Sequence, residues 1–255
     1  IDLNGSIVAD GNVGPSAVGD NAGGGGSGGS INILANTFTG AGLLQARGGT
    51  GGQQAFGFGG GGGSGGRIMV RFNVSTVNIS QASVTGGRNG SGTSGNGLSG
   101  QPGTLGFLSL PTDMLAINEG WRWQPDDLAV WNFTLINVTN AFTRVNGSSV
   151  NFSLPTFLLN NSSIAGERTT YNASFNMTNF QLIASNLSNG TIINVSALTM
   201  MVDSASSVAS NSTGFVGGVP NGGAGTGPGA AVAGSQGAGG HGGYGGSGSA
   251  AGSNV

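Results

Sequence analysis

A glycine-rich repeat of 37 residues is the sequence feature that most restricts the fold of this chain. The segment GGGGSGGSINI at 23–33 returns as GGGGSGGRIMV at 60–70, and the same offset aligns Gly11 with Gly48. A weaker third copy is expected over 77–106. A period of this size is typical of solenoid proteins, in which each repeat packs on the next. The period would also suit two β-helix turns of about 18 residues each.

The glycines are confined to the two ends of the chain, since only four of 55 lie within 107–213. This distribution predicts glycine-rich β-helical repeats over 1–106, a region rich in β-strands over 107–213 that continues the solenoid, and a glycine-rich tail over 214–255. Glycine permits close backbone approach and a polyglycine conformation, but it is also common in disordered linkers. Both an inter-subunit role and a linker role stay open for the tail.

The middle part alternates apolar and polar residues over 150–154, 171–177 and 193–197. Period 2 indicates strands with one buried face. Such segments start at regular intervals, near positions 131, 149, 171 and 191. This spacing fits successive coils of a parallel β-helix, but also the paired strands of a β-sandwich.

Shifts in this alternation favour the solenoid. Val74 and Val77 are three positions apart and would face opposite sides of a regular strand. We expect Phe72, Val74 and Val77 to share one face nevertheless, because a corner or a bulge between them changes the alternation. The sequence therefore predicts an all-β chain, a right-handed parallel β-helix with long glycine-rich loops. The alternative for the middle part is a β-sandwich.

Charge is scarce, and this excludes several functions. Charged residues make up 6% of the chain, with seven Arg, no Lys and nine acids, where about a quarter is usual. No basic stripe for nucleic acid is present, the absence of Cys rules out disulfides and cysteine metal sites, and no apolar run is long enough to span a bilayer. The chain starts at Ile1 without Met or a signal peptide, which suggests a processed product or a piece of a longer chain.

The sequon Asn-x-Ser/Thr occurs 16 times, where chance gives about 5. Because Asn160 and Asn161 are adjacent, at most one of them is expected to carry a glycan. The predicted N-glycosylation sites are Asn4, Asn73, Asn78, Asn89, Asn132, Asn137, Asn146, Asn151, Asn161, Asn172, Asn176, Asn186, Asn189, Asn194 and Asn211.

In nine of these sequons the central residue is apolar. In a strand, the Asn and the Ser/Thr then face one side and the apolar residue faces the other, so the core-building segments present acceptor asparagines outward. Two alternatives remain: the polar residues only solvate a sheet, or they form a stacked Asn ladder. Glycosylation predicts an extracellular protein, secreted or at the cell surface, with covalent glycans and no cofactor.

The N-terminal motifs resemble those of glycine-rich β-helical proteins of eukaryotic cell surfaces. The resemblance rests on LNGSIVADGN at 3–12, AGLLQARGGTGG at 41–52 and the two GGGGSGG segments, together with GAGGHGGYGGSG at 237–248. It implies a β-helix with a structural role at the cell surface. In that group the HGG-containing segment normally precedes the first strand, so its C-terminal place here suggests one unit of a head-to-tail series.

Few residues are candidates for chemistry. His241 has no second His or Cys beside it, and Asp126 and Asp127, near Glu119, are expected to form a solvated loop rather than a calcium site. No catalytic, metal or cofactor residue is predicted. Trp121 and Trp123 are candidates for stacking on a sugar or for a subunit contact.

We therefore expect a non-enzymatic, heavily N-glycosylated protomer of an extracellular filament or cell-surface appendage, whose partner is itself, head to tail. A second hypothesis is a carbohydrate-binding or polysaccharide-active module of a surface adhesin, with a groove near Trp121 and the acids at 113–127. A third is a glycine-rich spacer in a larger adhesin. No nucleic acid is an expected partner, and no membrane span is expected in this chain.

Overall fold

The computed structural model describes residues 1–17, 21–123, 132–147, 149–166, 171–188 and 190–209, and these are nearly all β. Besides one short 3₁₀ helix, η1 (Ile79–Gln81), the elements are β1 (Ser6–Val8), β2 (Ser30–Phe38), β3 (Leu43–Gln45), β4 (Arg67–Ser75), β5 (Ala82–Ser83), β6 (Thr104–Ser109), β7 (Met114–Trp123), β8 (Leu135–Val145), β9 (Ser149–Ser153), β10 (Thr156–Asn160), β11 (Ser163–Gly166), β12 (Tyr171–Ile183), β13 (Asn186–Leu187), β14 (Gly190–Val202) and β15 (Ser207–Val208).

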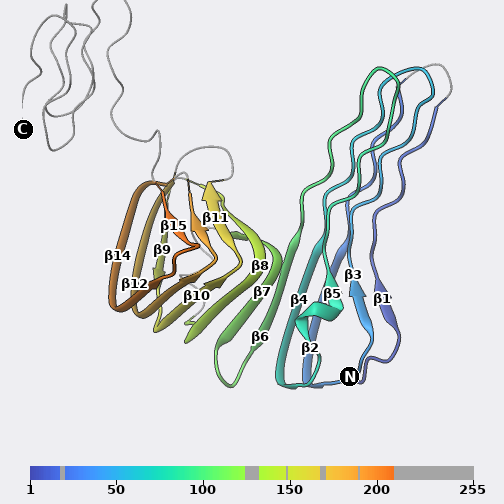
Figure 1. Cartoon of the computed structure of the whole chain (residues 1–255). Helices are drawn as coiled ribbons and strands as arrows, with labels where there is room; N and C mark the ends of the chain where they lie inside the picture. Colours follow the sequence, from blue (N-terminus) through green and yellow to red (C-terminus); the bar gives the residue numbers. More distant parts are fainter. Residues whose placement is uncertain (18–20, 124–131, 148, 167–170, 189, 210–255) are drawn as a thin grey trace, which may run out of the picture.

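The strands form one small and one long sheet (Figure 1). The small sheet has the order β1-β3-β5, and the long one runs β14-β12-β10-β8-β7-β6-β4-β2 with four short strands beside this path. Every named strand pair is parallel except β6–β7. This confirms an all-β chain. Because a β-sandwich is built from antiparallel sheets, the parallel pairing of the middle strands does not fit that alternative.

The first part advances by one strand in each sheet per repeat. Ser30 of β2 pairs with Arg67 of β4, 37 residues later, and Arg67 pairs with Thr104 of β6 at the same offset. The third copy of the repeat is therefore confirmed. The division into two shorter turns per repeat is wrong, because the whole repeat is needed to leave one sheet, pass through a long arm and return to the other.

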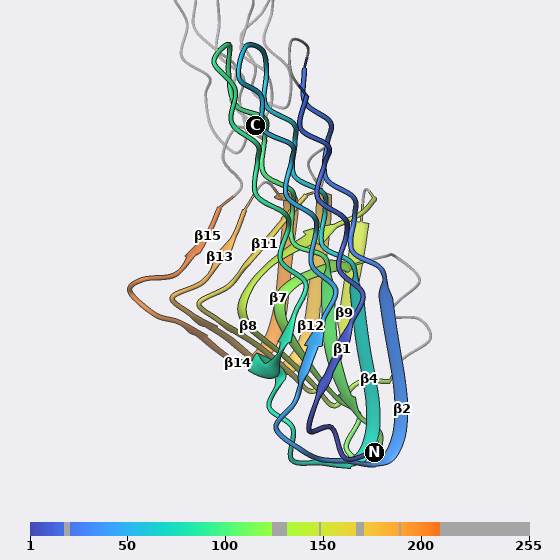
Figure 2. The same cartoon turned by 90° about the vertical axis from the view of Figure 1, so that its right-hand side faces the viewer.

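Each arm consists of an outbound and a return segment above the strands (Figures 1 and 2). The outbound segments are 9–16, 46–54 and 84–91, and the return segments are 22–29, 59–66 and 97–103. Their hydrogen bonds have a period of three. The N–H groups of Gly48 and Gly51 donate to the next outbound segment at 2.9 Å, whereas those of Gly49 and Gly52 donate to a return segment at 2.8–2.9 Å.

Three residues per turn without internal hydrogen bonds is the geometry of a polyproline II helix. Two of every three positions thus face neighbouring backbone, and the third faces outward. In the second outbound segment the outward positions are Arg47, Thr50 and Gln53, none of which is buried. The glycine-rich arms are therefore bundles of polyglycine helices with one row of side chains per segment.

Glycine is required because the segments are too close for a side chain between them. A Cβ at Gly49 would lie 1.9 Å from the carbonyl oxygen of Asn12, and one at Gly63 would lie 1.9 Å from that of Gly26. At the outward position Gly61, the nearest atom to such a Cβ is 3.6 Å away. Glycine is thus obligatory at inward positions and dispensable at outward ones.

The second part repeats over shorter distances. Leu135 of β8 pairs with Met114 of β7 on one side and with Thr156 of β10 on the other. A turn recurs at one edge, where Asn140 and Asn161 adopt φ of 51° and 46°. These two asparagines are 21 residues apart in the sequence, and the side-chain amide of Asn161 donates to that of Asn140 at 2.8 Å. One pass of the second part is therefore much shorter than one pass of the first.

Each part has its own apolar core. In the second part, Phe152 stacks on Phe175 with ring centroids 4.8 Å apart, and Trp123 meets Phe152 edge-on at 5.0 Å. One expected face is wrong: Val77 is buried but Val74 is 58% exposed. Val74 pairs with Thr37 near the end of β4, beyond the strand's buried residues Ile68 and Val70.

Replacing Gly63 by Ala tests the packing of the arms. We expect Gly63→Ala to lower the thermal midpoint of unfolding by several degrees, because the methyl group forces two hydrogen-bonded segments apart. The control Gly61→Ala, in the same segment, is expected to change it little or raise it slightly. Equal losses in both variants, measured by circular dichroism, would contradict this packing.

Candidate binding cleft and outward asparagines

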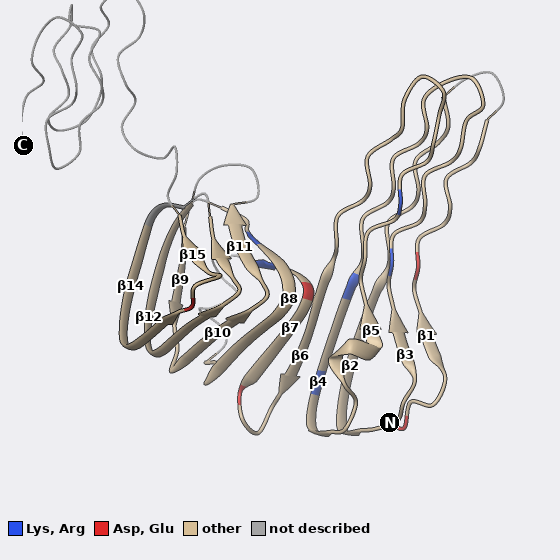
Figure 3. Cartoon of the chain, viewed as in Figure 1, with Lys and Arg blue, Asp and Glu red and all other residues tan. Residues whose placement is uncertain are grey.

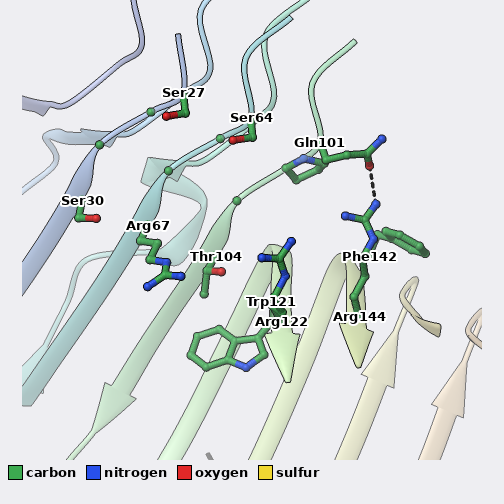
Figure 4. Close-up of a pocket in the computed structure, with 16 residues that line it drawn as sticks. Ser27, Ser30, Ser64, Arg67, Gln101, Thr104, Trp121, Arg122, Phe142 and Arg144 are labelled. Carbon is green, nitrogen blue, oxygen red and sulfur yellow. Dashed lines mark hydrogen bonds between the residues drawn. The ribbon is translucent and has the colours of Figure 1, made fainter. Parts of the chain in front are cut away.

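A cleft of about 500 Å³ lies where the two parts meet (Figure 4). One wall is the return side of the first part, residues 27–30, 64–67 and 101–104. The other wall comes from the far ends of β7 and β8, with Trp121, Arg122, Phe142 and Arg144. Its volume is in the range of pockets that hold small organic ligands.

The first wall repeats the arm geometry. Ser27, Ser64 and Gln101 occupy the same place in successive copies of the repeat, on adjacent return segments, and all three are exposed. A little further along, at the starts of the strands, lies a second row that contains Arg67 and Thr104. This wall therefore presents hydroxyl, amide and guanidinium groups in two parallel rows.

The second wall places two like charges side by side. Arg122 of β7 and Arg144 of β8 are direct partners in the parallel ladder, an arrangement that opposes stability unless the charges are compensated. The Arg144 guanidinium lies 4.7 Å from the ring centroid of Phe142, and its Nη2 donates to Oε1 of Gln101 on the first wall (Figure 4). Arg144 is thus held across the cleft.

A smaller pocket of about 400 Å³ adjoins the cleft and shares Arg67 and Trp121 with it. Arg71 and Phe133 also line this pocket. The Nε of Arg71 and the Nε1 of Trp121 are buried, and neither has a hydrogen-bond partner among the described residues. Buried donors without acceptors are costly, so these two N–H groups need an acceptor that the described residues do not supply.

The acids among the described residues lie outside the cleft. Charged residues are sparse over the described chain (Figure 3), and none of the 16 described residues that line the cleft is an acid. Asp10 pairs with Arg47 at 2.7 Å, and the hydrogen bond from that guanidinium lowers the pKa of Asp10. Glu119 accepts hydrogen bonds from the Val84 N–H and the Ser83 hydroxyl. Of the acids in the groove predicted at 113–127, the described ones, Asp113 and Glu119, do not line the cleft, and Asp126 and Asp127 lie outside the described residues.

The two tryptophans predicted as contact residues have different surroundings. Trp121 lines both the cleft and the pocket, and its ring packs against β6 over Gly106. Trp123 is 1% exposed, and its Nε1 donates to Thr143 Oγ1 at 3.0 Å in the core. Asp126, Asp127 and His241 lie outside the described residues, within which no group of three or more metal-ligating side chains occurs.

The asparagines of the sequons are mostly exposed. Asn89 and Asn137 are half-buried, and Asn189 and Asn211 lie outside the described residues. The exposed ones are Asn4, Asn73, Asn78, Asn132, Asn146, Asn151, Asn160, Asn161, Asn172, Asn176, Asn186 and Asn194. Six central apolar residues are buried, namely Phe133, Val138, Phe152, Ala173, Met177 and Leu187.

Four of these asparagines form a checkerboard on one sheet face. Ser174 of β12 lies between Asn151 of β9 and Asn194 of β14. Asn172 and Asn176 on β12 flank this row, and Asn176 has serines as partners on both sides. Each asparagine of the checkerboard thus stands clear of the next one, separated by a small residue or by two strand positions.

Comparisons of the chain with protein-family models, with curated proteins and with solved structures found no match. The resemblance to glycine-rich cell-surface proteins therefore stays a prediction. Within the described residues, no helix is long and apolar enough to cross a membrane.

The contact between Gly106 and Trp121 can be tested directly. A Cβ at Gly106 would lie 2.5 Å from Cζ3 of Trp121, so Gly106→Ala is expected to displace the indole and to shift the tryptophan emission. The shift should vanish when Trp121→Phe is the parent. Gly5→Ala, where no atom lies within 4 Å, is the control. An unchanged spectrum for Gly106→Ala would contradict this packing.

Proposed function

We propose that this chain is a glycosylated structural protomer of an extracellular filament or cell-surface appendage, assembled head to tail. The single observation that carries the proposal is the character of the two outermost strands of the long sheet. β2 has nine residues and β14 has 13, and neither contains a charged residue or a proline. Proteins that stay monomeric usually shorten, bend or charge such edges.

Apolar side chains add to the edges. Leu34 on β2 is 64% exposed, and Leu198 on β14 is 82% exposed, with Met200, Met201 and Val202 following it. Among the described residues no named strand pairs with the outer side of β2 or of β14. Residues 1–3 hydrogen-bond to the last part of the β2 edge, at Thr37 and Thr39, so the part of that edge before Thr37 is the open one. These two ends are therefore available for pairing and for apolar burial.

The occupant we propose for each end is a second copy of the chain. Along the sheet, β2 runs parallel to β6, and β14 runs parallel to β7. A β14 edge placed beside the β2 edge of the next copy would thus form an antiparallel pair, which is the pairing that already joins β6 to β7. Such a contact uses different surfaces on the two copies and need not close, so it extends into a filament.

The right-handed parallel β-helix predicted from the sequence belongs to this proposal. It is supported by parallel ladders in both parts, with a long, constant offset in the first and a shorter one in the second. Solenoid repeats stack in one direction within each part, which suits an extended assembly. An exposed, regular lattice of acceptor asparagines would then cover the fibre with glycans, in the place of surface charge.

Charges placed at the ends test the assembly. We expect the full chain to sediment as polymers, and we expect Leu34→Lys and Leu198→Lys each to stay monomeric, because a buried unpaired charge opposes the contact. Mixing the two variants should give dimers, since each retains one intact end. Analytical ultracentrifugation and electron microscopy measure both outcomes.

The control for this experiment is Val74→Lys, an exposed apolar position on an interior strand, which should polymerise normally. Dimers of Leu198→Lys alone would indicate a symmetric contact between β2 edges. A wild-type chain that remains monomeric at high concentration would contradict the assembly proposal altogether.

Mass spectrometry of protein secreted from a eukaryotic cell tests the glycan coat. We expect glycans at Asn151, Asn172, Asn176 and Asn194, because the folded chain leaves these side chains outside. Occupancy should be lower at half-buried Asn137, whose Oδ1 accepts from Thr139 at 3.2 Å. Folded, secreted protein without glycans on the checkerboard would show that its asparagines only solvate the sheet.

A further inference from the structure

The cleft between the two parts has the chemistry of a site for a polyanion. Three of the seven arginines of the chain line it, and a fourth, Arg71, lines the adjoining pocket. The chain has few charged residues and a net charge of −2, so arginines are much denser at the cleft than over the chain as a whole. We propose that the cleft binds an acidic polysaccharide, whose carboxylate or sulfate groups are held by Arg67 and Arg144.

Arginine is suited to this task because its planar fork donates two parallel hydrogen bonds to a carboxylate or a sulfate. Arg67 stands on the return-segment wall and Arg144 on the opposite wall (Figure 4). The contacts of Arg144 with Phe142 and Gln101 hold its guanidinium in place, which lowers the entropy lost on binding. Cations on both walls suit a chain with repeated anionic groups.

The remaining groups suit sugar rings. Ser27, Ser64 and Gln101 offer hydrogen bonds to hydroxyl groups along the first wall, and Trp121 and Phe142 offer aromatic surface on the second. In the adjoining smaller pocket, the buried Nε of Arg71 and Nε1 of Trp121 lack acceptors among the described residues. An anionic group that extends from the cleft into this pocket supplies the missing acceptor.

The described residues of the cleft offer binding groups rather than a hydrolytic pair. Glycoside hydrolysis normally requires two carboxyl groups on either side of the scissile bond. The described lining residues contain no acid, as noted above. The inferred role is therefore to anchor the protein to an acidic polysaccharide, and it does not depend on whether the chain forms filaments.

Calorimetry on the full chain tests this inference with three oligosaccharide probes of equal length. These are oligogalacturonate, which carries carboxylates, a heparin fragment, which carries sulfates, and neutral dextran. We expect at least one acidic probe to bind, with an affinity that falls as salt is added, and dextran not to bind. Preference between the two acidic probes identifies the anionic group.

Three single substitutions locate the site. Arg67→Gln and Arg144→Gln are expected to raise the Kd for the acidic probe about tenfold or more. Arg88→Gln removes the same charge from an exposed position on an outbound segment outside the cleft, and should leave the Kd unchanged. Thermal midpoints near that of the wild type confirm that the variants are folded.

Several outcomes would overturn the inference. These are no binding of either acidic probe, an equal loss of affinity in Arg88→Gln, or inorganic sulfate that binds as tightly as the oligosaccharide. The first would leave the cleft without the proposed ligand, the second would indicate diffuse attraction, and the third would indicate a simple anion site. Filament formation by the same variants is scored separately by microscopy, so the two proposals can fail independently.

Discussion

The rest of the structure depends on the close approach of glycine backbones in the arms. Hydrogen bonds of 2.6–3.2 Å join each segment to its neighbours, and the space for a Cβ at inward positions is filled by carbonyl groups of the adjacent segment. Order in these arms comes from backbone hydrogen bonds, because glycine has no side chain to bury. The paired strands at the base of the arms keep the same 37-residue offset as the arm segments. The rows of outward side chains on the first cleft wall follow from the three-residue period of these segments.

The reversal between β6 and β7 is the second determinant of the architecture. Glycine becomes rare in the sequence after Gly106. Beyond this point the sequence offset between neighbouring parallel strands is much shorter than in the first part. At the junction, Gly103 and Gly120 allow close contact, since a Cβ on Gly120 would lie 2.4 Å from the Gly103 carbonyl oxygen. A flat lattice and a strand-built unit meet there at an angle (Figure 1). The cleft is a consequence of that angle.

Much of the fold could be predicted from the sequence, because the close packing of the arm segments restricts which positions can hold a residue other than glycine. The offset of the first repeat is readable because each inward position accepts only glycine, and the outward asparagines are readable because strands alternate strictly. The division of that repeat into two turns was wrong because the polyglycine segments carry no hydrophobic period to mark them. A signal did exist: the outward positions Asp10, Val13 and Ser16 recur every third residue and return as Arg47, Thr50 and Gln53.

A groove near Trp121 was predicted, but the wall opposite it could not be, because the two walls come from segments distant in the sequence that only the antiparallel junction brings together. Trp121 was identifiable as an aromatic candidate, but Arg67 and Arg144 carry no sequence motif. Their significance depends on the scarcity of charge elsewhere. On a conventional surface, cations at a cleft would be offset by nearby acids. Here the two outermost strands carry no charge, the outer sheet face presents uncharged amides, and three arginines gather at one cleft whose described lining holds no acid.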